Sequence, residues 1–205
     1  MNRLQYLFAK WRGDEAAFAA ASVTEAELLK TIEGKQVALI GNARALAEQD
    51  YGAEIDSADV IIRINGAPMP SARSHGTRTD WLALAVRLSP DEFDRLGQPR
   101  LLWLSPKFKR ISWNVLQAPG FFRYPPARYQ RLRADLGTGP TTGIMMIDLL
   151  ATSRMAGLRL YGFDFFASLS LSGPRTKADV GHNFDGEAAF VADLSARDPR
   201  IVHRR

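Results

Sequence analysis

Short apolar runs alternate with amphipathic segments along most of the chain. The runs that predict buried strands are Gln36–Ile40, Val60–Ile64, Trp81–Ala85, Leu101–Leu104, Leu158–Tyr161 and Ile201–Val202. The segments between and after them that predict helices are Ala43–Glu48, Gly143–Met155 and Gly186–Leu194. Because strands alternate with helices, we expect an α/β fold with a mostly parallel sheet flanked by helices.

Residues 1–33 precede the first predicted strand, and their apolar positions recur at helical spacing, at Leu4, Leu7, Phe8 and Trp11. We therefore predict an N-terminal helical arm at 1–33 and one domain at 34–205. Two interpretations of the arm are open. It could pack on the core, or it could lie in a membrane interface, because the basic residues Arg3, Lys10 and Arg12 flank its aromatic side chains.

The composition narrows the class of protein. Hydrophobic residues make up 46% and charged residues 24% of the 205 residues, which is typical of a globular protein. The chain has no cysteine, which excludes disulfides, zinc–cysteine sites and thiol catalysis. No apolar run approaches the ~20 residues of a membrane span, so we expect a cytoplasmic protein.

The net charge of +5 indicates an anionic partner. Much of the positive charge lies in the segment from Arg100 to Arg133, where eight basic and seven aromatic residues interleave without any acidic residue. Lys107, Lys109, Arg110 and Arg123 are candidates for contacting an acceptor or a membrane. A platform for single-stranded nucleic acid is an alternative, although no nucleic-acid-binding motif accompanies the segment.

Two strand ends carry amide side chains. Gly41 and Asn42 follow the first strand, and Asn65 follows the second. Ligands of open α/β sheets bind at the carboxyl ends of strands, and an amide can both donate and accept hydrogen bonds. The alternative is that these residues only form turns.

Two further motifs point to chemistry. Gly137–Gly143 places Thr141, Thr142 and Gly143 at the start of an apolar helix, where free N–H groups and hydroxyls can hold an anion. His182 follows a glycine in a polar loop, and histidine can act as a general base near neutral pH. Nearby, Glu187 could orient His182 or cap the next helix.

Together these motifs resemble the sialyltransferase family, glycosyltransferase family 29. Val37 to Pro68, continuing to Gly76, Arg78 and Thr79, is similar to the L sialylmotif. Gly139 to Phe166 is similar to the S motif, and His182 with Glu187 matches the His-x4-Glu pattern of the VS motif. The chain also shows some likeness to the bacterial sialyltransferases of family 42.

The resemblance implies a Rossmann-like single domain of the GT-A-variant type. It implies transfer of sialic acid or Kdo from a CMP-sugar to a glycan or lipid-linked hydroxyl, with inversion and without a metal or other cofactor. Gly41, Asn42 and Asn65 would contact the donor, with the amides on its phosphate and nucleoside. The side of cytidine and ribose would be held by Thr141, Thr142 and Gly143, and His182 would be the general base.

Other residues follow from the same resemblance. No histidine lies between Phe163 and His182, so Arg175 and Lys177 are predicted to hold the phosphate instead. Arg63, Glu54 and Asp56 would form a shape-holding set of ion pairs under the crevice.

The resemblance also implies a setting. We expect a bacterial enzyme that touches the inner membrane peripherally. The alternatives are a CMP-sugar hydrolase, an inactive nucleotide-binding relative and a nucleic-acid-binding module.

Overall fold

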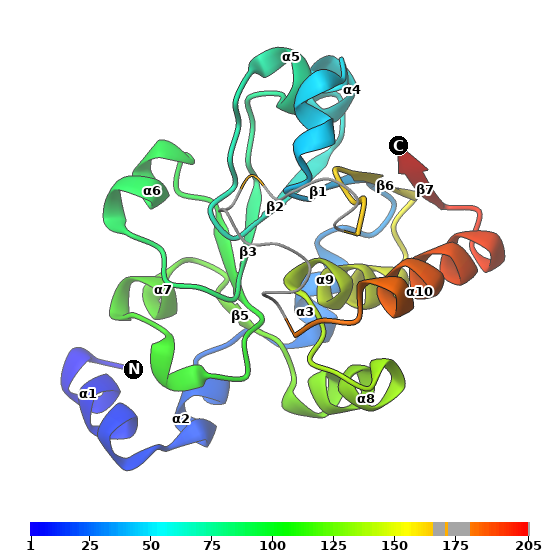
Figure 1. The fold of residues 1–205 in the computed structure, drawn as a ribbon. Coiled ribbons are helices and arrows are strands. Elements are labelled where there is room, and N and C mark those ends of the chain that lie inside the picture. The colour runs from blue at the N-terminus through cyan, green and yellow to red at the C-terminus, as the bar shows by residue number, and fades with distance from the viewer. Residues whose placement is uncertain (166–170, 172–180, 205) are drawn as a thin grey trace.

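The computed structural model describes residues 1–165, 171 and 181–204. Its strands form a single parallel sheet in the order β5-β4-β3-β2-β1-β6-β7 (Figure 1). The strands are β1 (Gln36–Ile40), β2 (Val60–Ile64), β3 (Trp81–Leu84), β4 (Arg100–Trp103), β5 (Phe122–Arg123), β6 (Gly157–Tyr161) and β7 (Ile201–Arg204). The strand order reverses between β1 and β6, and such a reversal is where open α/β sheets bind ligands.

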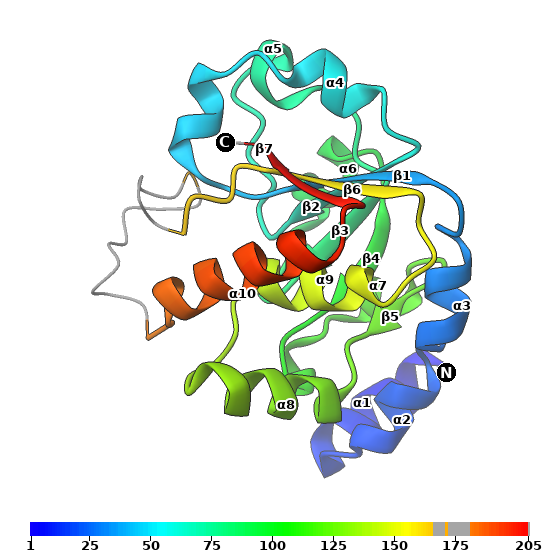
Figure 2. The ribbon, with the colours of Figure 1, turned by 90° about the vertical axis from the view of Figure 1, so that its right-hand side faces the viewer.

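One face of the sheet is covered by α3 (Glu25–Lys30), α8 (Pro126–Leu136), α9 (Thr142–Ala151) and α10 (Phe184–Arg197) (Figure 2). Helix α9 is the most apolar of these, and every residue from Thr142 to Leu150 is buried. Leu28 of α3 and the following Ile32 belong to the same core as α9. Helix α3, at the end of the predicted arm 1–33, therefore packs into the main core.

The other face is covered in two halves. Over β1 and β2 lie η1 (Arg44–Glu48), α4 (Gly52–Asp56) and α5 (Ala72–His75). The β3–β4 half packs against a second group, which comprises α1 (Arg3–Arg12), α2 (Glu15–Ala20), α6 (Pro90–Arg95), η2 (Phe108–Arg110) and α7 (Trp113–Gln117).

The sequence-based prediction of an α/β fold with a mostly parallel sheet is confirmed. The six predicted strands are present, and their ends lie within two residues of the predicted ones. Strand β5 and helices α4 to α8 were not predicted, since all but α8 are short and their apolar positions show no clear period.

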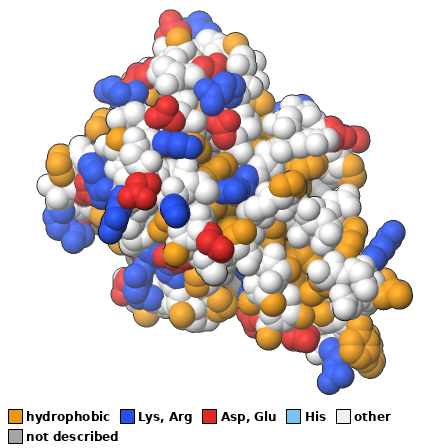
Figure 3. Space-filling model, turned by 180° about the vertical axis from the view of Figure 1, so that it is seen from behind, with side chains coloured by type: hydrophobic (Ala, Val, Ile, Leu, Met, Phe, Trp, Pro, Cys, Tyr) orange, Lys and Arg blue, Asp and Glu red, His pale blue; other side chains and the backbone are white. Residues whose placement is uncertain are grey.

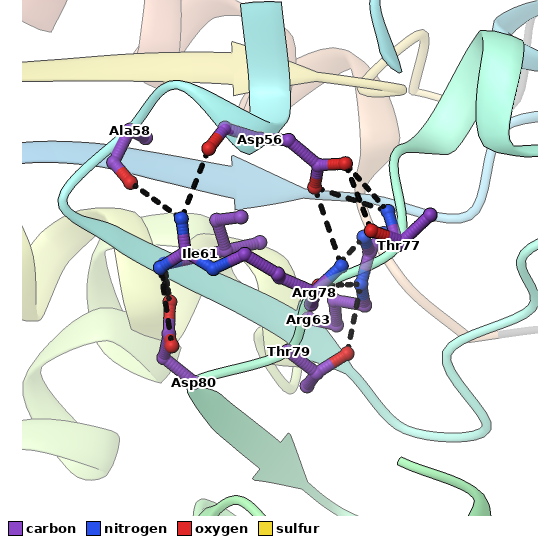
Figure 4. A network of polar contacts seen from close by, with 8 residues as sticks. All are labelled: Asp56, Ala58, Ile61, Arg63, Thr77, Arg78, Thr79 and Asp80. Carbon is purple, nitrogen blue, oxygen red and sulfur yellow. Dashed lines mark hydrogen bonds and ion pairs between the residues drawn. The ribbon is translucent and has the colours of Figure 1, made fainter. Parts of the chain in front are cut away.

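Arg63 lies in β2 and is almost fully buried, at 1% exposure. Its Nη2 donates to the carbonyl oxygens of His75 (2.7 Å) and Arg78 (2.8 Å), and its Nε donates to Thr79 Oγ1 (3.0 Å). Figure 4 shows how Arg63 and the neighbouring Asp56 converge on the loop from Thr77 to Asp80. Asp56 accepts hydrogen bonds from the backbone N–H groups of Thr77 and Arg78. The two side chains together fix this loop against the sheet.

The predicted ion-pair set needs correction at this point. Arg63 donates from Nε and Nη2 to carbonyl and hydroxyl oxygens, its buried Nη1 has no hydrogen-bond partner among the described residues, and it forms no ion pair with Glu54 or Asp56. Glu54 instead accepts from Arg204 of β7, at 2.8 Å. Two separate networks therefore take the place of the single predicted set of ion pairs. This is possible because backbone carbonyls can accept hydrogen bonds from a buried guanidinium, as a carboxylate can.

Candidate active site

A cleft of about 800 Å³ opens at the carboxyl ends of the strands. The ends of β1, β2 and β6 contribute Gly41, Asn42, Asn65 and Gly162. The start of α9 contributes Thr141, Thr142 and Gly143, and the loop before α10 contributes His182. Segments that lie far apart in the chain, and that were singled out independently in the sequence, thus meet in one cleft.

Gly41 brings β1 and β6 together at the floor of the cleft. A Cβ atom at this position would lie 2.2 Å from the carbonyl oxygen of Gly162. The backbone N–H of Gly41 also donates to Tyr161 O at 2.7 Å, and that of Ala43 donates to Gly162 O at 3.2 Å. A glycine is therefore required at position 41 because the backbone that follows β6 comes so close. The close packing of the protein alone accounts for this glycine, without any ligand.

The two amide side chains tie strand ends together. Asn42 Nδ2 donates to the carbonyl oxygen of Ile64 at 3.3 Å, which connects the end of β1 to the end of β2. Asn65 adopts the left-handed conformation with φ 52°, and its Oδ1 accepts from the N–H of Ala85 at 2.9 Å. Both residues line the cleft, and their hydrogen bonds also fix the strand ends that form it.

Glu187 lies buried at 3% exposure beneath the start of α9. Its two carboxylate oxygens accept from the N–H and the Oγ1 of Thr141, each at 2.8 Å. Burial raises the pKa of Glu187, and the bonds from Thr141 and the charge of His182 oppose that rise. Thr141 Oγ1 also caps the helix by accepting from the N–H of Ile144. The hydroxyl of Thr141 is therefore used within the protein and supports the site from below.

Thr142 and Gly143 are the first two residues of α9, so helix geometry leaves their N–H groups without an acceptor inside the helix. The helix dipole adds partial positive charge there. A Cβ atom on Gly143 would lie 2.6 Å from Cε1 of Phe163, whose ring packs on the helix start. The carbonyl of Phe163 accepts in turn from Nε2 of His203, at 2.6 Å.

Phe163 and His203 were not singled out as site residues in the sequence. Phe163 lines the cleft, and His203 of β7 contacts the carbonyl oxygen of Phe163. Phe163 comes two residues after β6, and β6 borders the point where the strand order reverses. This position in the sequence is the signal that could have identified Phe163. No sequence signal marks His203, since its contact depends on the pairing of β6 with β7.

His182 is partly buried in the wall of the cleft. Its Nδ1 lies 2.6 Å from the carbonyl oxygen of Gly139. A carbonyl can only accept, so Nδ1 carries the proton and Nε2 of the neutral ring keeps a lone pair. The edge of the ring also contacts Phe184, with 5.8 Å between the ring centroids. This arrangement fixes the tautomer that a base at Nε2 requires.

The four cations proposed for an acceptor or a membrane lie in three different settings. Lys107 and Arg110 line the cleft from η2 and the residue before it. Lys109 lies outside the cleft, beside Gly13 at the end of α1. Arg123 is a correction, because its side chain is only 4% exposed and forms an ion pair with Glu15. Arg123 therefore belongs to the interior and cannot line an exposed surface.

The rest of the basic and aromatic segment is also largely structural. Arg128 and Arg131 both pair with Asp148 of α9, at 2.7 Å and 2.5 Å. Trp103 and Phe122 are buried in the core. The segment from Arg100 to Arg133 therefore forms no continuous row of exposed aromatic and basic side chains, which is what a nucleic-acid platform needs.

The remaining expectations concern ions and membranes. Arg175 and Lys177 lie outside the described residues. Within residues 1–165, 171 and 181–204, no group of three or more His, Asp or Glu side chains is arranged to hold a metal ion. None of the helices in that part of the chain has the length and apolar character to cross a bilayer.

Comparisons with known proteins bear on both the motifs and the fold. Residues 14–87 match the family model of glycosyltransferase family 29 (sialyltransferase). No curated protein sequence matches the chain significantly.

Solved structures are similar at the level of the fold. A mammalian sialyltransferase in complex with Gal-β-1-3GalNAc-ortho-nitrophenol superposes with a TM-score of 0.63 at 20% identity, over 86% of this chain and 71% of the other. The sialyltransferase CstII from Campylobacter jejuni in complex with cytidine-5′-monophosphate gives 0.57 at 13% identity, over 83% of this chain and 80% of the other. The predicted resemblance is thus confirmed: the chain is similar to family 29 sialyltransferases in sequence over residues 14–87, and it has the fold of mammalian and bacterial sialyltransferases.

Proposed function

We propose that the protein is a CMP-sugar-dependent glycosyltransferase that moves sialic acid, or the related sugar Kdo, onto an acceptor hydroxyl. The observation that carries the proposal is the hydrogen bond between His182 and Gly139 in the wall of the cleft. It supports a histidine base held in one tautomer, close to a helix N-terminus that suits an anionic donor.

The cleft offers two kinds of protein group that could bind the anionic groups of a CMP-sugar. The N–H groups of Thr142 and Gly143 point from the start of α9, where a phosphate or a carboxylate is stabilised by the helix dipole. Lys107 and Arg110 add positive charge on another wall. We assign Gly41, Asn42 and Asn65 to the frame on which the nucleoside rests, and Thr141 to the support of the helix start.

In the proposed reaction, the acceptor oxygen attacks the anomeric carbon from the face opposite to the phosphate. The bond between that carbon and the phosphate oxygen breaks, so that CMP leaves and the configuration inverts. The acceptor proton passes to Nε2 of His182, while Nδ1–H stays on Gly139 O. Base catalysis of this kind contributes roughly 10²–10⁴ in rate. We propose that no metal takes part and that protein donors stabilise the leaving phosphate.

The test follows CMP release from CMP-sialic acid and from CMP-Kdo, with and without a panel of acceptor glycans and with and without EDTA. We expect release that depends on an acceptor and is insensitive to EDTA. Release without any acceptor would instead assign the protein as a CMP-sugar hydrolase. The absence of both CMP release and CMP binding, the latter measured by calorimetry, would overturn the proposal and favour an unrelated role.

His182→Ala tests the base directly. We expect transfer to fall by about 10²-fold or more, while the affinity for CMP stays within about twofold because Nε2 acts on the acceptor. Asp193→Asn is a matched control on the exposed face of α10, where Asp193 pairs with Arg197. Transfer at the wild-type rate by His182→Ala would remove His182 from the mechanism.

A further inference from the structure

Helix α1 contacts the rest of the protein through its less apolar side. Tyr6 and Ala9 are buried against the second core group, and Tyr6 Oη donates to the carbonyl of Ile111 at 2.9 Å. The ring of Tyr6 also contacts Trp113, with 5.4 Å between the centroids. The capping box of Asn2 and Gln5 fixes where the helix begins. The helix is thus held in a defined orientation.

That orientation turns the main apolar stripe outward. Leu4 and Trp11 are each 78% exposed, Leu7 is 53% exposed and Phe8 is 55% exposed. Among the described residues, the other large apolar side chains that are exposed are Met1, Val86 and Val202. Of the two interpretations left open for the arm, α1 packs on the core through Tyr6 and Ala9, whereas its apolar stripe faces outward. An exposed row of this kind marks an interaction surface.

Basic residues accompany the stripe on the helix itself, and the acidic residues Asp14 and Glu15 follow its end. Helix α1 carries Arg3, Lys10 and Arg12 and has no acidic residue. Arg12 lies over the ring of Phe8, at 5.4 Å from its centroid. Lys109 adds a further cation beside Gly13, at the end of the helix. Figure 3 shows apolar and basic side chains together at the lower right edge of the molecule, where α1 lies when it is seen from behind.

We propose that the exposed face of α1 docks on an anionic lipid bilayer. An interfacial helix buries Leu, Phe and Trp side chains at the level of the headgroups, while its Lys and Arg residues contact anionic lipids. Tryptophan in particular favours this depth. The charge of the surroundings favours an anionic membrane over a second copy of this chain, since two copies of α1 would bring like charges together.

Helix α1 contacts a segment that also lines the cleft. Lys10 and Tyr6 hold the carbonyl of Ile111, which directly follows η2. Arg110 of η2 lines the cleft. Helix α1 would therefore connect a bilayer on its outer face to the short segment on its inner face that forms one wall of the cleft; together with the proposed function, this suits an acceptor carried on a lipid.

The experiment measures binding of the full chain to vesicles, with no sugar donor present. Vesicles of phosphatidylcholine containing phosphatidylglycerol are compared with vesicles of phosphatidylcholine alone, at low and high salt. We expect binding to the anionic vesicles that weakens with salt. We also expect a blue shift of tryptophan emission, and the shift should disappear in Trp11→Phe.

A double variant, Leu4→Glu with Trp11→Glu, should reduce partitioning by at least about tenfold. Val202→Glu is the matched control, since Val202 is an exposed apolar residue on β7. Thermal unfolding checks that both variants fold. If the double variant does not fold, Arg3→Glu with Arg12→Glu tests the same surface through its charge, and it should lower binding to anionic vesicles by a similar factor.

Several results would overturn the proposal. One is the absence of binding to anionic vesicles at low salt, and another is wild-type binding by the double variant. Sedimentation velocity provides the third, because a dimer that the double variant abolishes, without any vesicle binding, would assign the stripe to a second copy of the chain.

Discussion

Nδ2 of Asn65 lies 3.3 Å from Oγ1 of Thr142, so the end of β2 is joined to the start of α9 across 77 positions of the chain. The same amide accepts from the N–H of Ala85 through its Oδ1. Three segments of the cleft wall therefore depend on one side chain. Its backbone, at φ 52°, is in the region that asparagine tolerates better than most residues.

Asn65 should respond differently to substitution by alanine and by glycine. Both variants lose the side-chain acceptor of the partly buried Ala85 N–H, which costs about 1 kcal/mol. Alanine also carries the cost of the left-handed backbone, about 1–2 kcal/mol, whereas glycine does not. We expect Asn65→Gly to be the more stable variant in urea unfolding, with both variants binding CMP more weakly than the wild type. Equal stability of the two would contradict the backbone argument.

Glu187 should act as a support of α9, which Glu187→Ala and Glu187→Gln can separate. Alanine leaves the N–H and hydroxyl of Thr141 without their acceptor and should cost about 1–3 kcal/mol of unfolding free energy. Glutamine keeps one acceptor and should lose less. If both variants transfer sugar at the wild-type rate once folded, Glu187 has no part in the chemistry. Loss of transfer in folded Glu187→Gln would instead support the catalytic role expected from the VS motif.

The charge of Glu187 should also leave a signature in the pH dependence of stability. Burial raises its pKa above the ordinary 4.5, so the folded state binds the proton more tightly than the unfolded state does. Its contribution to stability is full below that ordinary value and is lost as pH rises through the raised one. The stability of the wild type relative to Glu187→Gln should therefore fall as pH rises above the ordinary pKa of 4.5. A difference that stays constant, or one that rises, would contradict the raised pKa.

The carboxyl ends of the strands could be predicted to form a site because their place depends on local signals. Four of the apolar runs of four or five residues are followed by a glycine or a polar residue, at Gly41, Asn65, Ser105 and Gly162. In a parallel sheet these ends meet at one edge. The place of the cleft at this edge therefore follows from the strand pattern of the sequence, whereas the contacts within it do not.

The role of individual charges could not be predicted in this way. Arg123 looks like a surface cation in the sequence, but it pairs with Glu15, which is 108 positions away in the chain. The sequence also left open whether Leu4 and Trp11 face the core or a membrane, for a similar reason. Their direction depends on the contact of Tyr6 with the backbone of Ile111, and helical spacing alone does not say which face is covered.

The cations of the cleft provide a test with an internal control. Lys107 and Arg110 line the cleft, whereas Lys109 between them faces α1. Lys107→Glu and Arg110→Glu should each weaken CMP-sugar binding by about three- to tenfold, since an exposed charge contributes up to about 1 kcal/mol. Lys109→Glu should leave that affinity unchanged. Calorimetry at low salt measures all three, and an equal effect at Lys109 would indicate attraction by net charge only.

His75 should make the fold sensitive to mild acid. The residue is fully buried, with its Nδ1 at 2.8 Å from Ser74 Oγ, and its backbone carbonyl holds the guanidinium of Arg63. Burial, together with the charge of Arg63, lowers the pKa of His75 to about 4 from the ordinary 6.5. The folded protein thus binds fewer protons than the unfolded chain in this range. Stability present above pH 6.5 is lost as pH falls toward 4.

His75→Asn should flatten that dependence. Asparagine keeps a polar partner for Ser74 but cannot gain the charge, so the variant should lose less stability than the wild type over the same range, even if it is less stable at neutral pH. Asp56, whose pKa is lowered from 3.8, acts only at more acidic pH and leaves this window clear. Urea unfolding at stepped pH gives the difference between the two proteins, which cancels the other titrating groups. Parallel curves for the wild type and His75→Asn would show that His75 does not remain neutral in the fold.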